Sequence, residues 1–169
     1  TELALRHDPH EIARLLNEFF RIVVAAVDEQ HGLINKFQGD AALAVFGAPL
    51  HTADPTSAAL STARALTVEL RRLPVDFGIG VSAGPVFAGN IGAENRYEYT
   101  VIGDPVNEAA RLADCAKDFD GRALCSGPAI ARSESPERDC WAPRGATTLR
   151  GRSDPTDIYE PSSRGECQP

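Results

Sequence analysis

The sequence contains no methionine, a single tryptophan, and no apolar run long enough to cross a membrane. A membrane-spanning helix needs about 20 consecutive apolar residues, so we expect no direct membrane contact from this segment. Basic residues are also few, because 17 lysines and arginines stand against 24 aspartates and glutamates, a net charge of −7. Proteins that bind the phosphate backbone of nucleic acids carry a basic field instead. The composition therefore predicts a globular domain that binds neither membranes nor nucleic acids.

Several chemical signatures are missing as well. No Walker-type phosphate loop, Cys-x-x-Cys pair or Ser-His-Asp arrangement occurs, and the histidines show no metal-ligand spacing with the cysteines. The cysteines are few and widely spaced, unlike a disulfide scaffold, at positions 115, 125, 140 and 167. We therefore expect reduced thiols in a cytoplasmic protein.

Asp-Pro dipeptides divide the chain. Asp8, Asp54 and Asp104 each precede a proline and then apolar residues at helical spacing. Aspartate is a good helix N-cap and proline suits the first helical turn, which predicts three helices, the first over 9–30. No helical stripe follows Asp154, where we expect a turn between two short strands.

Strand-like runs lie between the predicted helices. Residues 33–37 and 42–46 flank Gly39-Asp40, which predicts a hairpin. Further strands are expected over 75–83, within 84–103, and near 122–126, 146–150 and 156–160. This order predicts an α+β or α/β fold with helices packed on a mixed sheet. The length suits one domain, which we assign to 1–161, followed by a polar tail over 162–169.

Polar residues with chemical potential gather at two places. Lys36 and Asp40 lie near the tip of the predicted hairpin, where a carboxylate is a suitable ligand for a hard cation, although such turns are common. Asn107 and Arg111 are four residues apart and share one face of the third helix. An amide beside a guanidinium suits a sugar edge and a phosphate, and the alternative is a solvated helix face.

Thr100 lies on the strand that enters this third helix, where its hydroxyl can donate or accept a hydrogen bond. Arg150 and Arg152 lie on a terminal hairpin. They predict either a phosphate contact or a solubilising edge.

Taken in order, these segments resemble the catalytic domain of the class III nucleotidyl cyclases, specifically the bacterial adenylate cyclases, over about 5–161. The resemblance rests on Leu-Leu-Asn-Glu-Phe-Phe (15–20), Lys-Phe-Gln-Gly-Asp (36–40), Gly-Pro-Val-Phe-Ala-Gly-Asn-Ile-Gly (84–92), Tyr-Thr-Val-Ile-Gly-Asp-Pro-Val-Asn-Glu-Ala-Ala-Arg-Leu (99–112) and Leu-Arg-Gly-Arg (149–152). It implies a ferredoxin-like (βαββαβ-type) cyclase fold. It also implies that ATP is converted to 3′,5′-cyclic AMP and pyrophosphate by in-line attack of the ribose 3′-oxygen on the α-phosphate, assisted by two Mg²⁺ or Mn²⁺ ions.

The resemblance also implies a role for each candidate. Lys36 matches the lysine that reads the adenine ring. Thr100 falls where many members carry aspartate and a subgroup carries threonine, and its hydroxyl would bind the same purine edge. Asn107 matches the residue that orients the ribose, and Arg111 the one that stabilises charge at the α-phosphate. The two remaining matches are Arg150, which contacts the terminal phosphates, and Asp40, the second of two metal-binding aspartates.

In this family the active site forms between two subunits, so the resemblance implies a symmetric homodimer with shared sites. The Gly-rich segment 84–92 matches the strand that leads into the dimerisation arm. The family's first metal aspartate lies further before Asp40 than Thr1 does, so we expect the first strand to be missing from this sequence. The alternatives are an inactive homologue that acts as a nucleotide-binding or dimerisation module, and a guanylate cyclase. The expected location is the cytoplasm, either alone or as the cytoplasmic domain of a larger membrane-tethered protein.

Overall fold

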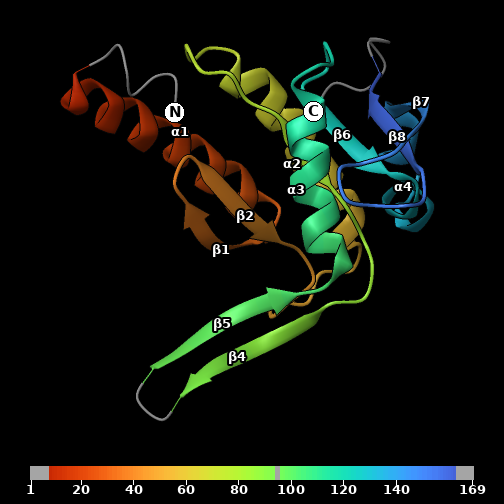
Figure 1. Ribbon diagram of the computed structural model, residues 1–169, viewed down its shortest axis with the longest axis horizontal. Helices are drawn as coiled ribbons and strands as arrows, with labels where there is room; N and C mark the ends of the chain where they lie inside the picture. The colour runs from red at the N-terminus through yellow and green to blue at the C-terminus, as the bar shows by residue number, and fades with distance from the viewer. Residues whose placement is uncertain (1–7, 94–95, 163–169) are drawn as a thin grey trace.

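The computed structural model describes residues 8–93 and 96–162 (Figure 1). The predicted polar tail lies almost entirely outside the described residues. The elements, in chain order, are α1 (Pro9–Glu29), β1 (Leu33–Gln38), β2 (Ala41–Val45), α2 (Pro55–Leu70), β3 (Ile79–Val81), β4 (Phe87–Ala93), β5 (Arg96–Ile102), α3 (Asp104–Ala116), β6 (Ala123–Ser126), α4 (Gly127–Arg132), the 3₁₀ turn η2 (Arg138–Cys140), β7 (Trp141–Thr147) and β8 (Thr156–Pro161).

The strands of the described residues form three separate hydrogen-bonded units. The mixed sheet has the order β3-β6-β8-β7, in which β3 and β6 are parallel and the other pairs antiparallel. The hairpins β1–β2 and β4–β5 stand apart from it, and β4–β5 projects from the body as a long arm (Figure 1). The α+β prediction with helices on a mixed sheet is confirmed. The strand predicted over 75–83 shortens to Ile79–Val81, because only these residues pair with β6.

Two of the three predicted N-caps are confirmed. The Asp8 carboxylate accepts a hydrogen bond from the His10 backbone N–H at 3.2 Å, and the Asp54 carboxylate accepts one from Ser57 at 2.9 Å. The prediction for α3 is wrong by one residue. Gly103 is its N-cap, and Asp104 is the first helical residue. Its carboxylate instead accepts a hydrogen bond from Arg152 at 2.8 Å, a partner distant in sequence.

The core consists of three apolar clusters around the helices. One cluster joins α1, α2 and the β1–β2 hairpin, a second joins α2 to the mixed sheet, and the third lies between α3, β6 and β8. Each cluster contains at least one fully buried leucine, and each such burial stabilises the fold by roughly 1.5–3 kcal/mol. These leucines are Leu70 in the first cluster, Leu60 in the second, and Leu112 and Leu124 in the third.

α3 packs unusually close to β3. A Cβ added at Gly80 would lie 1.9 Å from the backbone oxygen of Ala109, so only glycine permits this contact. The close packing sets the height of α3, and therefore of its polar face, above the sheet.

The thiols follow the sequence expectation in part. Cys115 and Cys125 are free, and burial raises the pKa of both, which keeps them protonated and unreactive. Cys140 is disulfide-bonded, so the expectation of reduced thiols is wrong there. Sequence spacing cannot reveal which cysteines the fold brings together. Among the described residues, no helix is both long and apolar enough to cross a bilayer.

Candidate functional site

Thr100, Asn107 and Arg111 lie on one continuous stretch of backbone. Thr100 pairs with Gly89 within the β4–β5 arm, and α3 begins two residues after β5 ends. Asn107 is exposed and Arg111 half-buried, on successive turns of α3. Both residues lie within α3, four positions apart, as the predicted amide and guanidinium on one helix face require. The opposite side of the helix packs against β6 and β8, where Leu112 and Ala116 are fully buried.

The loop between β7 and β8 lies against the same face of α3. The Arg152 N–H donates to the Leu149 carbonyl at 3.0 Å, which closes a tight turn, and Gly151 in that turn has φ +74°. A Cβ added at Gly151 would lie 3.4 Å from Nη2 of Arg111. The turn therefore rests on the Arg111 guanidinium, and Arg150 is exposed at its tip.

Arg150 and Arg152, equivalent in the sequence analysis, have different surroundings. Nη2 of Arg152 donates to Asp104 Oδ2 at 2.8 Å. Its Nη1 lies 3.1 Å from Glu108 Oε1, an ion pair whose geometry falls short of a hydrogen bond. The prediction that Arg152 contacts phosphate or solubilises an edge is therefore wrong in this structure: it is bound to α3.

A bulge in β1 connects Lys36 to Thr100. Ile34 pairs with Ala44 and Lys36 with Leu43, so Asn35 is the extra residue. Its side-chain amide donates to the Tyr99 carbonyl on β5 at 2.9 Å. Because Lys36 follows Asn35 and Thr100 follows Tyr99, this hydrogen bond brings the two predicted base-reading residues onto adjoining segments. Lys36 and Thr100 are both half-buried.

Asp40 is exposed in the turn between β1 and β2, four residues after Lys36. The predicted hairpin with Gly39-Asp40 as its turn is confirmed. Among the described residues, no group of three or more His, Cys, Asp or Glu side chains is placed to hold a metal ion. A carboxylate at a hairpin turn nevertheless fits Mg²⁺, which proteins bind through one or two carboxylates together with substrate phosphates and water.

Three polar residues hold this arrangement together in ways that sequence reasoning missed. Asn35 and Glu108 were not singled out, and the binding of Arg152 to α3 was not predicted. Glu108 follows Asn107 on α3 and is only 6% exposed. The sequence shows Glu108 only as a charged residue beside the apolar stripe of the helix, and its burial could not be predicted. Its partners were not visible, because Ser82, Arg152 and Thr156 come from three other parts of the chain.

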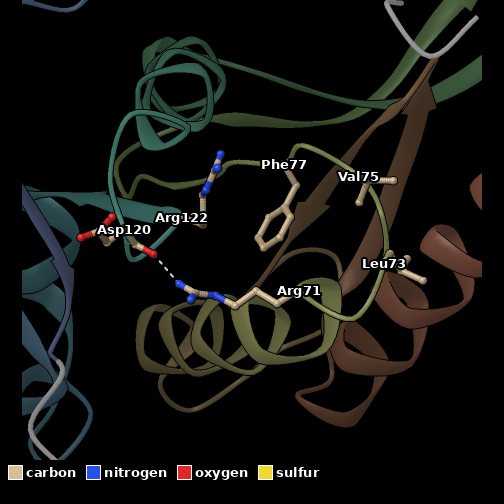
Figure 2. Close-up of a pocket in the computed structure, with 6 residues that line it drawn as sticks. All are labelled: Arg71, Leu73, Val75, Phe77, Asp120 and Arg122. Carbon is tan, nitrogen blue, oxygen red and sulfur yellow. Dashed lines mark hydrogen bonds between the residues drawn. The ribbon is translucent and has the colours of Figure 1, made fainter.

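Surface pockets do not mark this site. A pocket of about 330 Å³ lies at the end of α2, with Phe77 on its wall (Figure 2). Its two guanidinium groups are already paired, since Arg71 donates to the Asp120 carbonyl and Arg122 binds Asp76 at 2.5 Å. A second pocket lies against the first half of α1. None of the predicted site residues lines either of these two pockets.

Comparison with known families gives one match over most of the chain. The sequence model described as "Adenylate and Guanylate cyclase catalytic domain" matches residues 1–157. Curated relatives include an uncharacterized protein of Mycobacterium tuberculosis (strain CDC 1551 / Oshkosh), 48% identical over 166 residues. That alignment covers 97% of this chain and 30% of the relative. A relative from Mycobacterium bovis is 47% identical over 163 residues, covering 95% of this chain and 30% of the relative. This chain thus spans about a third of their length.

Solved structures of similar fold include enzymes of two specificities. The adenylyl cyclase CyaB from P. aeruginosa superposes with a TM-score of 0.84 at 25% identity, covering 99% of this chain and 90% of that one. The guanylyl cyclase Cya2 superposes with a TM-score of 0.84 at 26% identity, covering 98% and 87%. A bacterial light-regulated adenylyl cyclase gives a TM-score of 0.80 at 25% identity, covering 94% of this chain and 46% of that one.

Proposed function

This chain belongs to the family of adenylate and guanylate cyclase catalytic domains, and we propose that within it the chain is an adenylate cyclase that converts ATP to 3′,5′-cyclic AMP and pyrophosphate. The observation that supports the choice of ATP is the Asn35–Tyr99 hydrogen bond, which joins the strand segments that carry Lys36 and Thr100. An ammonium group is only a donor, and N1 of adenine is an acceptor. Guanine carries N1–H at that edge, so its donor would face the Lys36 donor unpaired.

The remaining residues act on the sugar and the phosphates. Asn107 orients the ribose so that the 3′-oxygen is in line with the α-phosphorus. The 3′-hydroxyl releases its proton to solvent as its oxygen forms the new bond to the α-phosphorus, the bond from that phosphorus to the bridging oxygen of the β-phosphate breaks, and pyrophosphate leaves. Arg111 is placed where negative charge grows on the α-phosphate, and Arg150 contacts the leaving phosphates, so both groups stabilise the transition state more than the ground state.

Asp40 is the residue of this segment that would hold a divalent cation, Mg²⁺ or Mn²⁺. When bound, such ions lower the pKa of the attacking hydroxyl and neutralise phosphate charge. The contribution of Asp40 itself is a charged oxygen ligand on the short, hydrogen-bonded hairpin β1–β2. A rigid support of this kind limits the positions that the carboxylate can reach.

The domain works, in this proposal, as a homodimer whose active sites are shared between subunits. The projecting arm β4–β5 supports this arrangement, because both strands expose large apolar side chains to solvent, among them Phe87, Ile91, Tyr97 and Ile102. Exposed apolar surface gathered on one projecting element marks a binding site for another protein. Thr100 is on the same arm, so a partner bound there would lie next to the active site.

Guanylate cyclase activity is the second candidate, because the similar folds include both an adenylyl and a guanylyl cyclase at equal TM-score. One experiment separates the two. The full-length protein is incubated with ATP or GTP, together with Mg²⁺ or Mn²⁺, and cyclic AMP and cyclic GMP are quantified at concentrations where dimers form. We expect cyclic AMP as the main product. Predominant cyclic GMP would establish the second candidate. The absence of both products would indicate an inactive homologue that binds nucleotide or mediates dimerisation.

A further inference from the structure

Glu108 is a buried carboxylate with no role in the reaction proposed above. It lies between Asn107 and the core residue Leu112 on α3, with 6% of its surface exposed. The Ser82 hydroxyl donates to its Oε2 at 2.5 Å, and the Thr156 hydroxyl donates weakly to Oε1 at 3.4 Å. A buried carboxylate needs a compensating positive charge. Arg152 supplies that charge, 3.1 Å from Oε1.

Arg152 binds α3 at two points, one helical turn apart. One guanidinium nitrogen pairs with Glu108 and the other donates to Asp104, four residues earlier on the helix. Both terminal nitrogens are therefore directed at carboxylates, and the side chain is only 24% exposed. A guanidinium engaged in this way holds its backbone in place and does not face a substrate phosphate.

The backbone held by Arg152 is the turn that carries Arg150. Leu149, at the start of the turn, is 4% exposed and belongs to the same apolar cluster as Leu112. Arg152, at the end, is bound to Glu108 and Asp104. Between these two anchors the chain passes over Arg111. A Cβ added at Gly151 would lie 3.4 Å from the Arg111 guanidinium. The anchors thus determine how Arg150 and Arg111 lie relative to each other.

We propose that Glu108 and Arg152 are positioning residues, which fix the 149–152 turn on α3 so that Arg150 and Arg111 face one triphosphate from adjoining elements. This assignment rests on the proposed cyclase function. It explains why a glutamate is buried in the same helix as the catalytic candidates. It also explains why two arginines separated by a single glycine have different exposures, since one contacts substrate and the other holds the turn.

The chain offers a matched control in Arg144. Arg144 on β7 pairs with Glu160 on β8, a carboxylate whose side chain is 7% exposed, compared with 8% for that of Glu108. Both ion pairs therefore tie an arginine of the β7–β8 region to a buried glutamate. Of these two arginines, only Arg152 belongs to the turn whose Gly151 lies against Arg111. Arg152→Gln and Arg144→Gln therefore each remove an ion pair to a buried glutamate, with different expected effects on catalysis.

The test compares these two variants with the wild-type protein. At a temperature well below the Tm of each, we measure kcat, the KM for ATP, inhibition by pyrophosphate and inhibition by adenosine, together with hydrogen–deuterium exchange over residues 148–155. We expect Arg152→Gln to lower kcat about 10-fold or more, since small misplacements of catalytic groups have large effects on rate. Pyrophosphate inhibition should weaken severalfold, adenosine inhibition should stay unchanged, and exchange of the turn should accelerate. Arg144→Gln should keep wild-type kinetics.

Glu108→Gln serves as the second variant, because the amide retains hydrogen bonding while the charge is lost. It should show the same selective weakening of pyrophosphate inhibition as Arg152→Gln. An active wild type in which Arg152→Gln and Arg144→Gln have the same kcat and the same pyrophosphate inhibition overturns the positioning roles alone. A wild-type protein that forms no cyclic nucleotide overturns the proposed function and this assignment together, so the two failures are distinguishable.

Discussion

Lys36 and Asn35 are neighbours in the sequence, and only one of them could be recognised there. Lys36 belongs to a short polar motif near a hairpin turn, a pattern with a chemical interpretation. Asn35 is an ordinary polar residue in a strand-like run. Its contact with the Tyr99 carbonyl depends on the bulge in β1 and on the approach of β5, and both are tertiary features. The most specific contact between the two base-reading segments was therefore outside the reach of sequence reasoning.

The role of Asn35 can be measured directly. Asn35→Ala removes the hydrogen bond between β1 and β5, so the segments that carry Lys36 and Thr100 are no longer joined by it. A hydrogen bond of this kind contributes about 1 kcal/mol, and we expect the KM for ATP to rise about fivefold with a smaller change in kcat. Discrimination between ATP and GTP should fall as well. Steady-state kinetics with both nucleotides measures these effects.

A surface asparagine provides the comparison for this substitution. Asn17 is exposed on α1, and we expect Asn17→Ala to leave both KM values at their wild-type levels. If Asn35→Ala also leaves the KM for ATP and the ATP preference unchanged, the hydrogen bond to Tyr99 has no part in base recognition.

At the scale of whole elements, the Asp-Pro pattern predicted where helices begin. Asp8 and Asp54 cap α1 and α2 as predicted, because capping is a local interaction between a carboxylate and N–H groups two or three residues away. Asp104 departs from the pattern because Arg152, far along the chain, competes for its carboxylate. The boundaries of strand β3 also depend on a distant partner, because β6 pairs with only three residues of the run predicted over 75–83.

Asp54 allows the contribution of one cap to be tested by pH. Its carboxylate accepts backbone N–H bonds from Ser57 at 2.9 Å and Glu134 at 3.2 Å. Burial acts to raise the pKa of Asp54, but the hydrogen bonds from Ser57, Glu134 and Thr56 outweigh it and lower the pKa below its ordinary value of 3.8. A carboxyl group with a lowered pKa in the folded state stabilises the protein above its unfolded pKa, and this stability is lost as the pH falls through the folded value.

Two substitutions separate the cap from the charge. Asp54→Ala should lower the free energy of unfolding by about 1 kcal/mol at pH 7, whereas Asp54→Asn, also a good cap, should change it by a few tenths. Urea unfolding between pH 7 and about 3 should show that the stability difference between wild type and Asp54→Asn shifts in favour of the asparagine variant as the pH falls. A difference that is constant across this range would contradict the lowered pKa.

At the scale of the whole molecule, the proposed dimer divides the candidate residues into two groups. Lys36, Thr100, Asn107, Arg111 and Arg150 are connected through α3 and the strands and turn that adjoin it. Asp40 is exposed at the turn of the β1–β2 hairpin, whose first strand carries Lys36. With the apolar arm β4–β5 available for a partner, the two groups suit a dimer in which each active site takes Asp40 from one subunit and the remaining residues from the other.

Mixed dimers test this shared arrangement. Arg111→Ala and Asp40→Ala homodimers should each lack cyclase activity, because every site misses one component. Random mixing places half of the chains in heterodimers with one intact site of two, so about a quarter of wild-type activity should return. Cyclic AMP formation before and after subunit exchange measures the recovery. Thermal unfolding of both single variants should remain cooperative, and a failure of mixing to restore any activity would contradict shared sites.

The sequence by itself determined the features that depend on near neighbours along the chain. These are the helix starts at Asp8 and Asp54, the hairpin turn at Gly39-Asp40, the α+β class, and the motif order that indicates a nucleotidyl cyclase. Only the tertiary structure decided which polar groups support the site. The pairing of Glu108 with Arg152, and of Asn35 with Tyr99, joins residues more than 40 positions apart. Such contacts form because packing brings the segments together, and buried polar groups then require partners wherever the fold supplies them.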